Sequence, residues 1–211
     1  MSKRAGGSKG RRGASALLRG CVHKGCVYFW SSVPKNYPED CPYYVFSQWY
    51  PAHFMDPEDG QAYSSAEQYM MAGKAKLFGD SEALEKIVET TQPRAVKALG
   101  RSVRGFDEAT WDQNKYDIVV RGTRLKFSQN EELMNILLST GDLAIAEAAP
   151  NDRVWGIGLG PEKALATTSR SEWRGSNLLG KALVQVRDEL KEEGPSPQSE
   201  ASSAKPCGDA E

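Results

Sequence analysis

Residues 64–79 of the chain have the sequence SSAEQYMMAGKAKLFG. The segment opens with Ser64 and, three residues later, Glu67, which is the pattern of a helix capping box, and it ends at Gly79, a common helix stop. Apolar residues recur between these ends at helical spacing. The pattern predicts a helix from which Glu67 and Lys74, two turns apart, project on one face.

The flanking sequence adds more helices and a few short strands. Helices are predicted to start after Asp80, at Pro93 with an end at Gly100, after Asp107, after Asn130, and at about residue 176 with an end at 190. Apolar runs at residues 27–30, 43–46 and 143–149 predict strands, and a glycine-rich loop covers residues 150–161. The expected fold class is α+β, a mainly helical single domain with a few short strands.

The composition supports one folded domain between two polar ends. The chain has 211 residues, 39% of them hydrophobic and 26% charged, which is typical of a globular protein. Residues 1–26 are rich in Gly, Ser, Lys and Arg, and residues 191–211 are rich in Ser, Pro and Glu. We expect a disordered basic arm over 1–26, one folded domain over 27–190 and a disordered tail over 191–211.

The net charge of -1 hides a strong asymmetry along the chain. The first 38 residues contain eight Lys or Arg and no Asp or Glu, which leaves 19 basic against 28 acidic residues in the remainder. A basic arm gives salt-dependent attraction to phosphates, so contact with DNA or RNA is one interpretation. An organellar transit peptide and a solvated tail are the alternatives.

The sequence contains neither an apolar run of about 20 residues nor the apolar middle segment of a secretory signal. We expect an intracellular protein, cytoplasmic or nuclear, without a membrane partner. The four cysteines, at positions 21, 26, 41 and 207, are then expected to be reduced and unpaired. Cys21, His23 and Cys26 offer three zinc ligands without a well-spaced second pair, so no metal is expected.

Three segments carry residues suited to chemistry, each with a structural alternative. Glu67 is either a reactive carboxylate or a helix cap. Asp152 and Trp155 lie in the glycine-rich loop, where Trp155 either stacks on a nucleobase or anchors the core. Arg174, close to the start of the last predicted helix, suits an anion site, although capping by Ser176 or Asn177 explains the same segment.

In this order, the segments resemble the NADAR (YbiA-like) family across about residues 27–190. The matching residues are Phe46-Ser47 with Trp49, Ser65-Ala-Glu67-Gln68-Tyr69 with Lys74-Ala75, Leu99-Gly100-Arg101, Trp111, Lys126-Phe127, Asn151-Asp152 with Trp155-Gly156, and Asn177-Leu-Leu-Gly180. Gln48 is a departure, because the family often has Asn after the Phe-Ser pair.

The resemblance implies an N-glycosidase that needs no cofactor and has Glu67 and Asp152 as its reactive carboxylates. We assign Glu67 to the sugar and Asp152 to acid/base chemistry, and the reverse assignment stays open. Candidate substrate-binding residues are Trp111, Trp155, Lys74, Arg101, Arg174, Asn177 and Gly156, with Lys74, Arg101 and Arg174 directed at phosphates.

The resemblance also implies two substrate classes. The leading hypothesis is hydrolysis of ADP-ribose from guanine, in a nucleotide or in nucleic acid. Phosphorylated ribosylamino-pyrimidine intermediates of riboflavin synthesis are the alternative substrates. A third hypothesis, from a different class, is a non-catalytic module that binds ADP-ribose or NAD.

Overall fold

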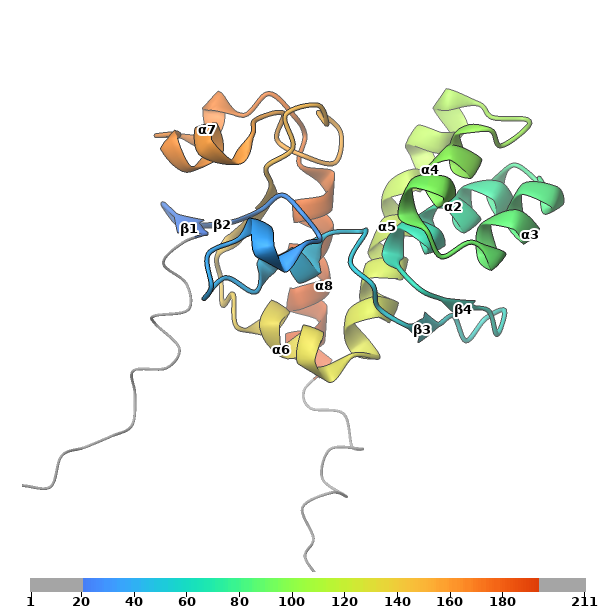
Figure 1. Ribbon diagram of the computed structural model, residues 1–211, viewed down its shortest axis with the longest axis horizontal. Helices are drawn as coiled ribbons and strands as arrows, with labels where there is room; N and C mark the ends of the chain where they lie inside the picture. The colour runs from blue at the N-terminus through green and yellow to red at the C-terminus, as the bar shows by residue number, and fades with distance from the viewer. Residues whose placement is uncertain (1–20, 194–211) are drawn as a thin grey trace, which may run out of the picture.

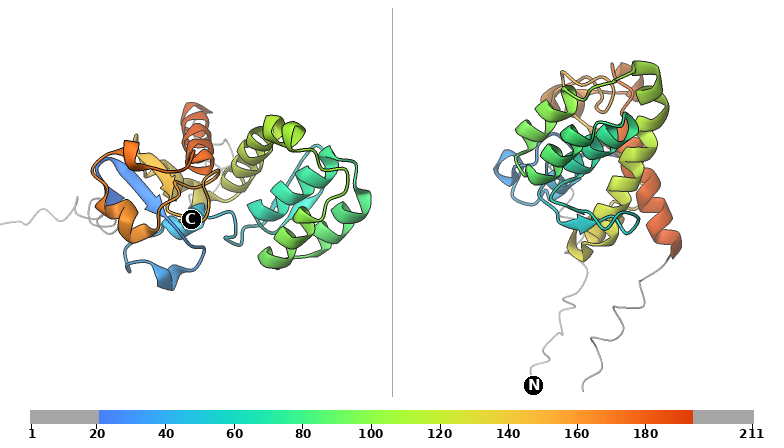
Figure 2. Two further views of the ribbon diagram at one scale, coloured as in Figure 1. Left: turned by 90° about the horizontal axis from the view of Figure 1, so that it is seen from above. Right: turned by 90° about the vertical axis from the view of Figure 1, so that its right-hand side faces the viewer.

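The computed structural model describes residues 21–193 and confirms the α+β class (Figure 1). The longest helix, α5 (Glu108–Ser128), has helical layers on both sides. One side holds α2 (Ala66–Leu77), α3 (Ser81–Glu89) and α4 (Pro93–Arg101). The other side holds α6 (Glu131–Leu138) and α8 (Leu178–Glu193). Viewed from above, α5 and α8 lie between the α2–α4 group and a small sheet (Figure 2).

The sheet has the order β1 (Val22–His23), β2 (Cys26–Phe29), β5 (Ala144–Glu147). Strands β1 and β2 form a hairpin whose turn, Lys24-Gly25, has positive φ at both residues, as a two-residue hairpin turn of this hand requires. Strand β5 lies parallel to β2, with Glu147 opposite Phe29. All of β2 is buried, as expected of a strand with a parallel neighbour and a covered face.

Local sequence signals set most helix boundaries correctly. Ser65, Asp80 and Asp107 each accept a backbone N–H with the side chain at a helix start, and Pro93 opens α4. Gly79 has a φ of +67°, the left-handed conformation that ends α2. The predicted helix starts after Asp80 and Asp107 and at Pro93, and the stop at Gly79, are confirmed, since caps satisfy backbone groups that the helix itself leaves unpaired. The predicted capping box at Ser64 lies one residue too early, because the cap of α2 is Ser65.

Several predicted features are wrong. Residues 43–46 form a 3-10 helix (η2, Tyr43–Phe46) after Pro42 instead of a strand, and the Val45 carbonyl accepts a hydrogen bond from Lys126 at 2.6 Å instead of pairing with a strand. The folded body begins before residue 27, since β1 and the hairpin turn lie within residues 21–26, and α8 continues to Glu193. The predicted disorder of residues 1–20 and 194–211 lies outside the described residues.

The last helix begins later than predicted, at Leu178, because Asn177 has a φ of +53°. Three short elements have no counterpart in the prediction. They are η1 (Pro34–Asn36), α7 (Pro161–Ala166) and η3 (Arg170–Glu172). A separate hairpin of β3 (Phe54–Met55) and β4 (Ala62–Tyr63) precedes α2.

The expectation of unpaired cysteines is wrong for two of them. Cys21 and Cys41 form a disulfide across 20 residues of sequence, whereas Cys26 is free and buried. The hairpin carries Cys21 to the segment that precedes η2, a tertiary approach that spacing alone does not reveal. His23 contacts the Thr167 carbonyl through Nε2, so the three candidate zinc ligands are engaged separately. Cys207 lies outside the described residues.

Within residues 21–193, no helix is both long and apolar enough to cross a membrane.

Candidate active site

A cleft of about 820 Å³ separates α2 and α4 from the carboxyl end of β5 and the loop that follows it. It contains carboxylates from two sides of the molecule, Glu67 from α2 and Glu147 and Asp152 from β5 and its loop. It also contains a row of cations from α4 and three tryptophans. These residues are Arg94, Lys97, Arg101, Trp30, Trp49 and Trp155.

Glu67 is free of the capping role that its sequence suggests. The cap at the start of α2 is Ser65, whose Oγ accepts the Gln68 N–H at 3.2 Å, and the Gln68 Oε1 accepts the Ser64 N–H at 2.7 Å. The capping pair is therefore shifted by one residue, and Glu67 is directed into the cleft with only 6% of its surface exposed. Burial raises its pKa, while Lys97 and a hydrogen bond from the Trp49 side chain oppose that rise.

Asp152 is held by the backbone of its own loop. Its Oδ1 accepts the N–H groups of Val154 at 2.9 Å, Trp155 at 2.7 Å and Gly156 at 3.4 Å. These bonds hold the carboxylate in one orientation. The same bonds fix Trp155 beside the carboxylate, at the wall of the cleft.

Glu147 is a functional candidate that the sequence interpretation missed. It is the last residue of β5 and lines the cleft. Burial raises its pKa to about 7, and the neighbouring Asp152 carboxylate adds to the rise. The available signal was its position, because it is the one charged residue in the apolar run at 143–149 and stands where a buried strand meets a glycine-rich loop.

The cations of α4 form a stripe that the sequence interpretation recognised only at Arg101. Arg94, Lys97 and Arg101 are three and four residues apart, so they share one helix face, and all three line the cleft. Among residues 21–193, none of these cations has a carboxylate within ion-pair distance, unlike the nearby Arg104, which binds Asp80. We call these residues the α4 stripe.

Close packing of two helices brings the α4 stripe to the carboxylates. Gly100 faces Met71 of α2, and a methyl group at position 100 would overlap the Met71 side chain. The absence of a side chain at Gly100 thus lets α4 approach α2. Lys97 and Arg101 consequently lie close enough to Glu67 to oppose the rise of its pKa that burial causes.

Aromatic residues form the remaining walls. Trp30 stacks on Tyr37 with ring centroids 4.2 Å apart, and the Lys97 Nζ lies 5.7 Å from the centre of the Trp49 ring. Gln48 also lines the cleft, and its Oε1 is buried without a hydrogen-bond partner among the described residues. Flat apolar walls with a few polar groups suit a ligand that carries a base or sugar ring.

The family is decided by a sequence model of the NADAR domain, which matches residues 28–191. The chain belongs to the NADAR family. The match confirms the resemblance and includes every element that lines the cleft.

Individual NADAR proteins are similar over most of the described body. The N-glycosidase R617 of Acanthamoeba polyphaga mimivirus is 49% identical over 149 residues, which are 69% of this chain and 87% of the viral protein. The chloroplastic riboflavin biosynthesis protein PYRR of Zea mays is 30% identical over 156 residues, which are 69% of this chain and 23% of the maize protein. The NMR structure of Escherichia coli YbiA aligns with a TM-score of 0.64 and 25% identity, over 85% of this chain and 94% of that chain.

Some NADAR motif residues lie away from the cleft. Lys74 donates to the Gly100 carbonyl at 2.9 Å and lies over the rings of Phe106 and Trp111, so this group supports the α2–α4 contact. Arg174 is exposed beside Gly158. Lys74 and Arg174 were predicted to bind phosphate, and Trp111 to shape the pocket. In this structure none of the three lines the cleft.

Asn177 and Gly156 also have roles within the protein. The Asn177 side chain accepts the Glu147 N–H at 3.1 Å and donates to the Ile145 carbonyl at 2.9 Å, so both of its polar groups bind β5. Gly156 donates to Asp152, and its carbonyl accepts the Asn177 N–H. Both residues shape the strand end and loop that display Glu147 and Asp152, and neither lines the cleft.

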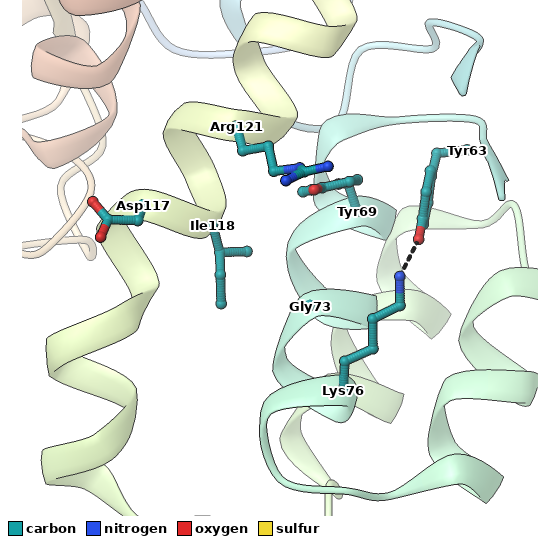
Figure 3. A pocket seen from close by; sticks show the side chains of 7 residues that line it. All are labelled: Tyr63, Tyr69, Gly73, Lys76, Asp117, Ile118 and Arg121. Atoms are coloured by element: carbon teal, nitrogen blue, oxygen red, sulfur yellow. Dashed lines mark hydrogen bonds between the residues drawn. The ribbon is translucent and has the colours of Figure 1, made fainter. Parts of the chain in front are cut away.

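A smaller cavity of about 210 Å³ lies between α2 and α5 and shares no lining residue with the cleft (Figure 3). The two cations in its lining, Lys76 and Arg121, are engaged by the protein. Lys76 binds Tyr63 and Asp59, and Arg121 binds both oxygens of Asp56. The cations of the smaller cavity are thus paired, whereas those of the cleft are not paired within residues 21–193, and this contrast favours the cleft as the active site.

Proposed function

We propose that this chain removes ADP-ribose from guanine by hydrolysing the bond between C1′ of the ribose and the base. As a NADAR protein related to named N-glycosidases, the chain is a hydrolase of N-glycosyl bonds. The observation that carries the narrower proposal is the α4 stripe, which lies in the same cleft as the carboxylates. A ribose beside a diphosphate matches this arrangement, with carboxylates at the sugar and cations at the phosphates.

The carboxylates suit cleavage of an N-glycosyl bond. As the C1′–N bond breaks, positive charge develops on the ribose, and an adjacent carboxylate stabilises it electrostatically. We assign this role to Glu67, which is buried and close to Asp152 in the cleft. Asp152, anchored through Oδ1, is assigned to the attacking water, whose proton it accepts.

The dimensions of the cleft support a large substrate. Arg94 and Arg101 are seven residues apart, which is about 10 Å along a helix. That distance exceeds what one phosphate requires and fits a diphosphate with the sugar next to it. The volume of about 820 Å³ falls in the upper part of the usual range for ligand sites, roughly 300–1,000 Å³.

The rival substrate is a phosphorylated ribosylamino-pyrimidine, and similarity to the maize PYRR protein favours it. The same carboxylates would serve that reaction, since the bond broken is of the same type. The difference lies at the phosphates, because this substrate carries only one. We therefore expect replacement of Arg94 by Ala to matter for the ADP-ribosyl substrate and little for the pyrimidine.

Chromatography of product tests the proposal directly. The purified chain is incubated with an oligonucleotide that carries ADP-ribosyl-guanine and, in parallel, with the ribosylamino-pyrimidine. Free ADP-ribose from the first substrate supports the proposal, and cleavage of the second alone supports the riboflavin branch. Binding of ADP-ribose without turnover of either would indicate a non-catalytic module.

A matched pair of variants locates the chemistry. Glu67→Gln keeps the shape of the side chain and, as the cap of α2 does not use Glu67, should fold normally while losing at least about 100-fold in kcat. Glu85→Gln, at an exposed position on α3 outside the cleft lining, should keep full activity. Wild-type turnover by a folded Glu67→Gln protein would exclude Glu67 from catalysis.

We also propose that the basic arm contacts nucleic acid. Because the β1–β2 hairpin starts at Val22, a deletion that tests the arm should stop at residue 20. Loss of residues 1–20 should weaken binding to DNA or RNA oligonucleotides, measured by fluorescence anisotropy, more at low salt than at high salt. Unchanged affinity at low salt would exclude this role.

A further inference from the structure

Glu147 is held in the cleft by its backbone. Its N–H donates to Asn177 Oδ1 at 3.1 Å, and its carbonyl accepts the N–H groups of Ile157 at 2.9 Å and Ala149 at 3.1 Å. Its side chain lines the cleft with Glu67 and Asp152. The backbone of Glu147 is therefore fixed where the strand meets the cleft, and its side chain extends from this fixed point into the cleft.

The three carboxylates have different surroundings. Asp152 accepts backbone N–H groups, and Glu67 has the Trp49 side chain, Lys97 and Arg101 nearby. The carboxyl group of Glu147 has no hydrogen-bond donor and no ion pair among residues 21–193. The charged or titratable groups that face it are Asp152, Glu67, Lys97 and Tyr37.

Three carboxylates in one partly buried site do not all ionise near neutral pH, because like charges at short range raise the cost of the last ionisation. The retained proton resides on the carboxyl group that has the fewest donors. Tyr37 does not supply one, because its hydroxyl donates to the Ser31 carbonyl and accepts the N–H groups of Trp30 and Ser31. Glu147 is thus the member of the cluster that keeps a proton.

We propose that Glu147 is a third catalytic carboxyl group and donates a proton to the departing base. This inference rests on the proposed function, because it assigns the acid for the same bond cleavage. When the C1′–N bond breaks, its electron pair passes to the base nitrogen, and the base takes up the Glu147 proton. Water then adds to C1′ and gives a proton to Asp152, so one water molecule is consumed and the cluster keeps its proton count.

The pKa of Glu147 agrees with this role. A value of about 7 leaves a substantial fraction of the side chain protonated at neutral pH, which is the condition for a general acid that works there. The role also separates the carboxylates by function, with Glu67 at the sugar, Asp152 at the water and Glu147 at the base. Asn177 becomes a positioning residue, since it acts on the backbone of Glu147.

The first test follows kcat/KM with pH for the full chain and for Glu147→Gln. The wild type should lose activity above about pH 7, as the acid ionises, whereas Glu147→Gln should be at least 100-fold slower and lack this alkaline limb. ADP-ribose affinity, measured by calorimetry, should change less than threefold. An alkaline limb that persists in Glu147→Gln would overturn the proposal.

A second variant shifts the limb instead of removing it. Lys97 lowers the pKa of Glu147, so Lys97→Met should move the alkaline limb to higher pH. If Glu147 had only a structural role, removal of the Lys97 charge would not move the alkaline limb through Glu147. Unchanged position of the limb in a folded Lys97→Met protein would contradict the assignment.

The closing experiment needs no substrate. With ¹³C-carboxyl-labelled glutamate, one resonance should titrate near pH 7 and be absent from Glu147→Gln, while a signal assigned through Glu67→Gln remains. If the Glu147 resonance titrates near its ordinary value of 4.5 instead, the proposal is overturned even for an active enzyme. Failure of the ADP-ribosyl-guanine assay leaves this resonance unaffected, so the two failures are distinguishable.

Discussion

Replacement of Lys126 by Met should change how the stability of the protein depends on pH. Lys126 is only 1% exposed, and its Nζ donates to the carbonyls of Val45 at 2.6 Å and Ser47 at 3.0 Å. Burial lowers its pKa from the ordinary 10.5 to about 7. Between these pH values the unfolded chain binds one proton more than the folded chain, so the free energy of unfolding rises with pH.

The size of the effect follows from the two pKa values. Each pH unit within this window contributes up to about 1.4 kcal/mol, which amounts to about 2 kcal/mol between pH 7 and pH 9. Lys126→Met lacks this titration. The difference in unfolding free energy, wild type minus Lys126→Met, should therefore increase by about 2 kcal/mol over that range. Lost hydrogen bonds to the two carbonyls add an offset that does not vary with pH.

Urea unfolding followed by tryptophan fluorescence at pH 7, 8 and 9 measures this difference. Other titrating groups, such as the buried Cys26, cancel because they are present in both proteins. Lys86→Met, which removes an exposed lysine of α3, is the control and should parallel the wild type. If the Lys126→Met curve also runs parallel to the wild type, the reasoning about the buried ammonium group is refuted.

The remaining predictions concern the supports of the cleft. Gly100→Ala should cost about 1–3 kcal/mol of stability, measured by urea unfolding, because the added methyl group overlaps Met71. It should also raise KM, since the α4 stripe is displaced. An unchanged KM would show that the α4 stripe does not bind substrate. Asn177→Ala should lower the free energy of unfolding by about 2–4 kcal/mol and reduce kcat, since it leaves backbone groups of β5 unpaired. Asn177→Gly, in which the positive φ costs nothing, should show the same loss of kcat. Full kcat in both variants would show that Asn177 does not position Glu147. Reduction of the Cys21–Cys41 disulfide should lower stability by about 3 kcal/mol in thermal unfolding, and a double Ser variant should be insensitive to reductant; equal sensitivity would show that another bond is being reduced.

The sequence predicted well the features that depend on neighbouring residues. Asp80 and Asp107 announce helix starts because a side-chain oxygen two or three residues before a free N–H is enough to satisfy it. The assignment of residues 43–46 to a strand was wrong for the opposite reason. An aromatic run fits a strand, but the carbonyls of Val45 and of Ser47, which follows the segment, accept hydrogen bonds from Lys126, about 80 residues away.

The candidate site shows the same division between local and distant signals. Glu67 and Asp152 were found because each belongs to a recognisable segment. Glu147 was missed because its importance comes from two other carboxylates that only the fold brings near. Asn177 was interpreted as a ligand contact, since an amide before a helix looks available in sequence, whereas its partners lie 30 and 32 residues earlier in β5.

The one-residue shift of the α2 cap has a practical consequence. Ser65 and Gln68 complete the helix start, and the Gln68 side chain also secures the end of α3 through the carbonyls of Ile87, Val88 and Thr90. The start of α2 therefore does not need the Glu67 carboxylate, and a Gln side chain there can still accept the hydrogen bond from Trp49. An inactive chain altered only there would keep its cleft and hold substrate without releasing it. Immobilised on a resin, such a chain would serve as a capture reagent for the N-glycosyl substrates of the native protein in a cell extract.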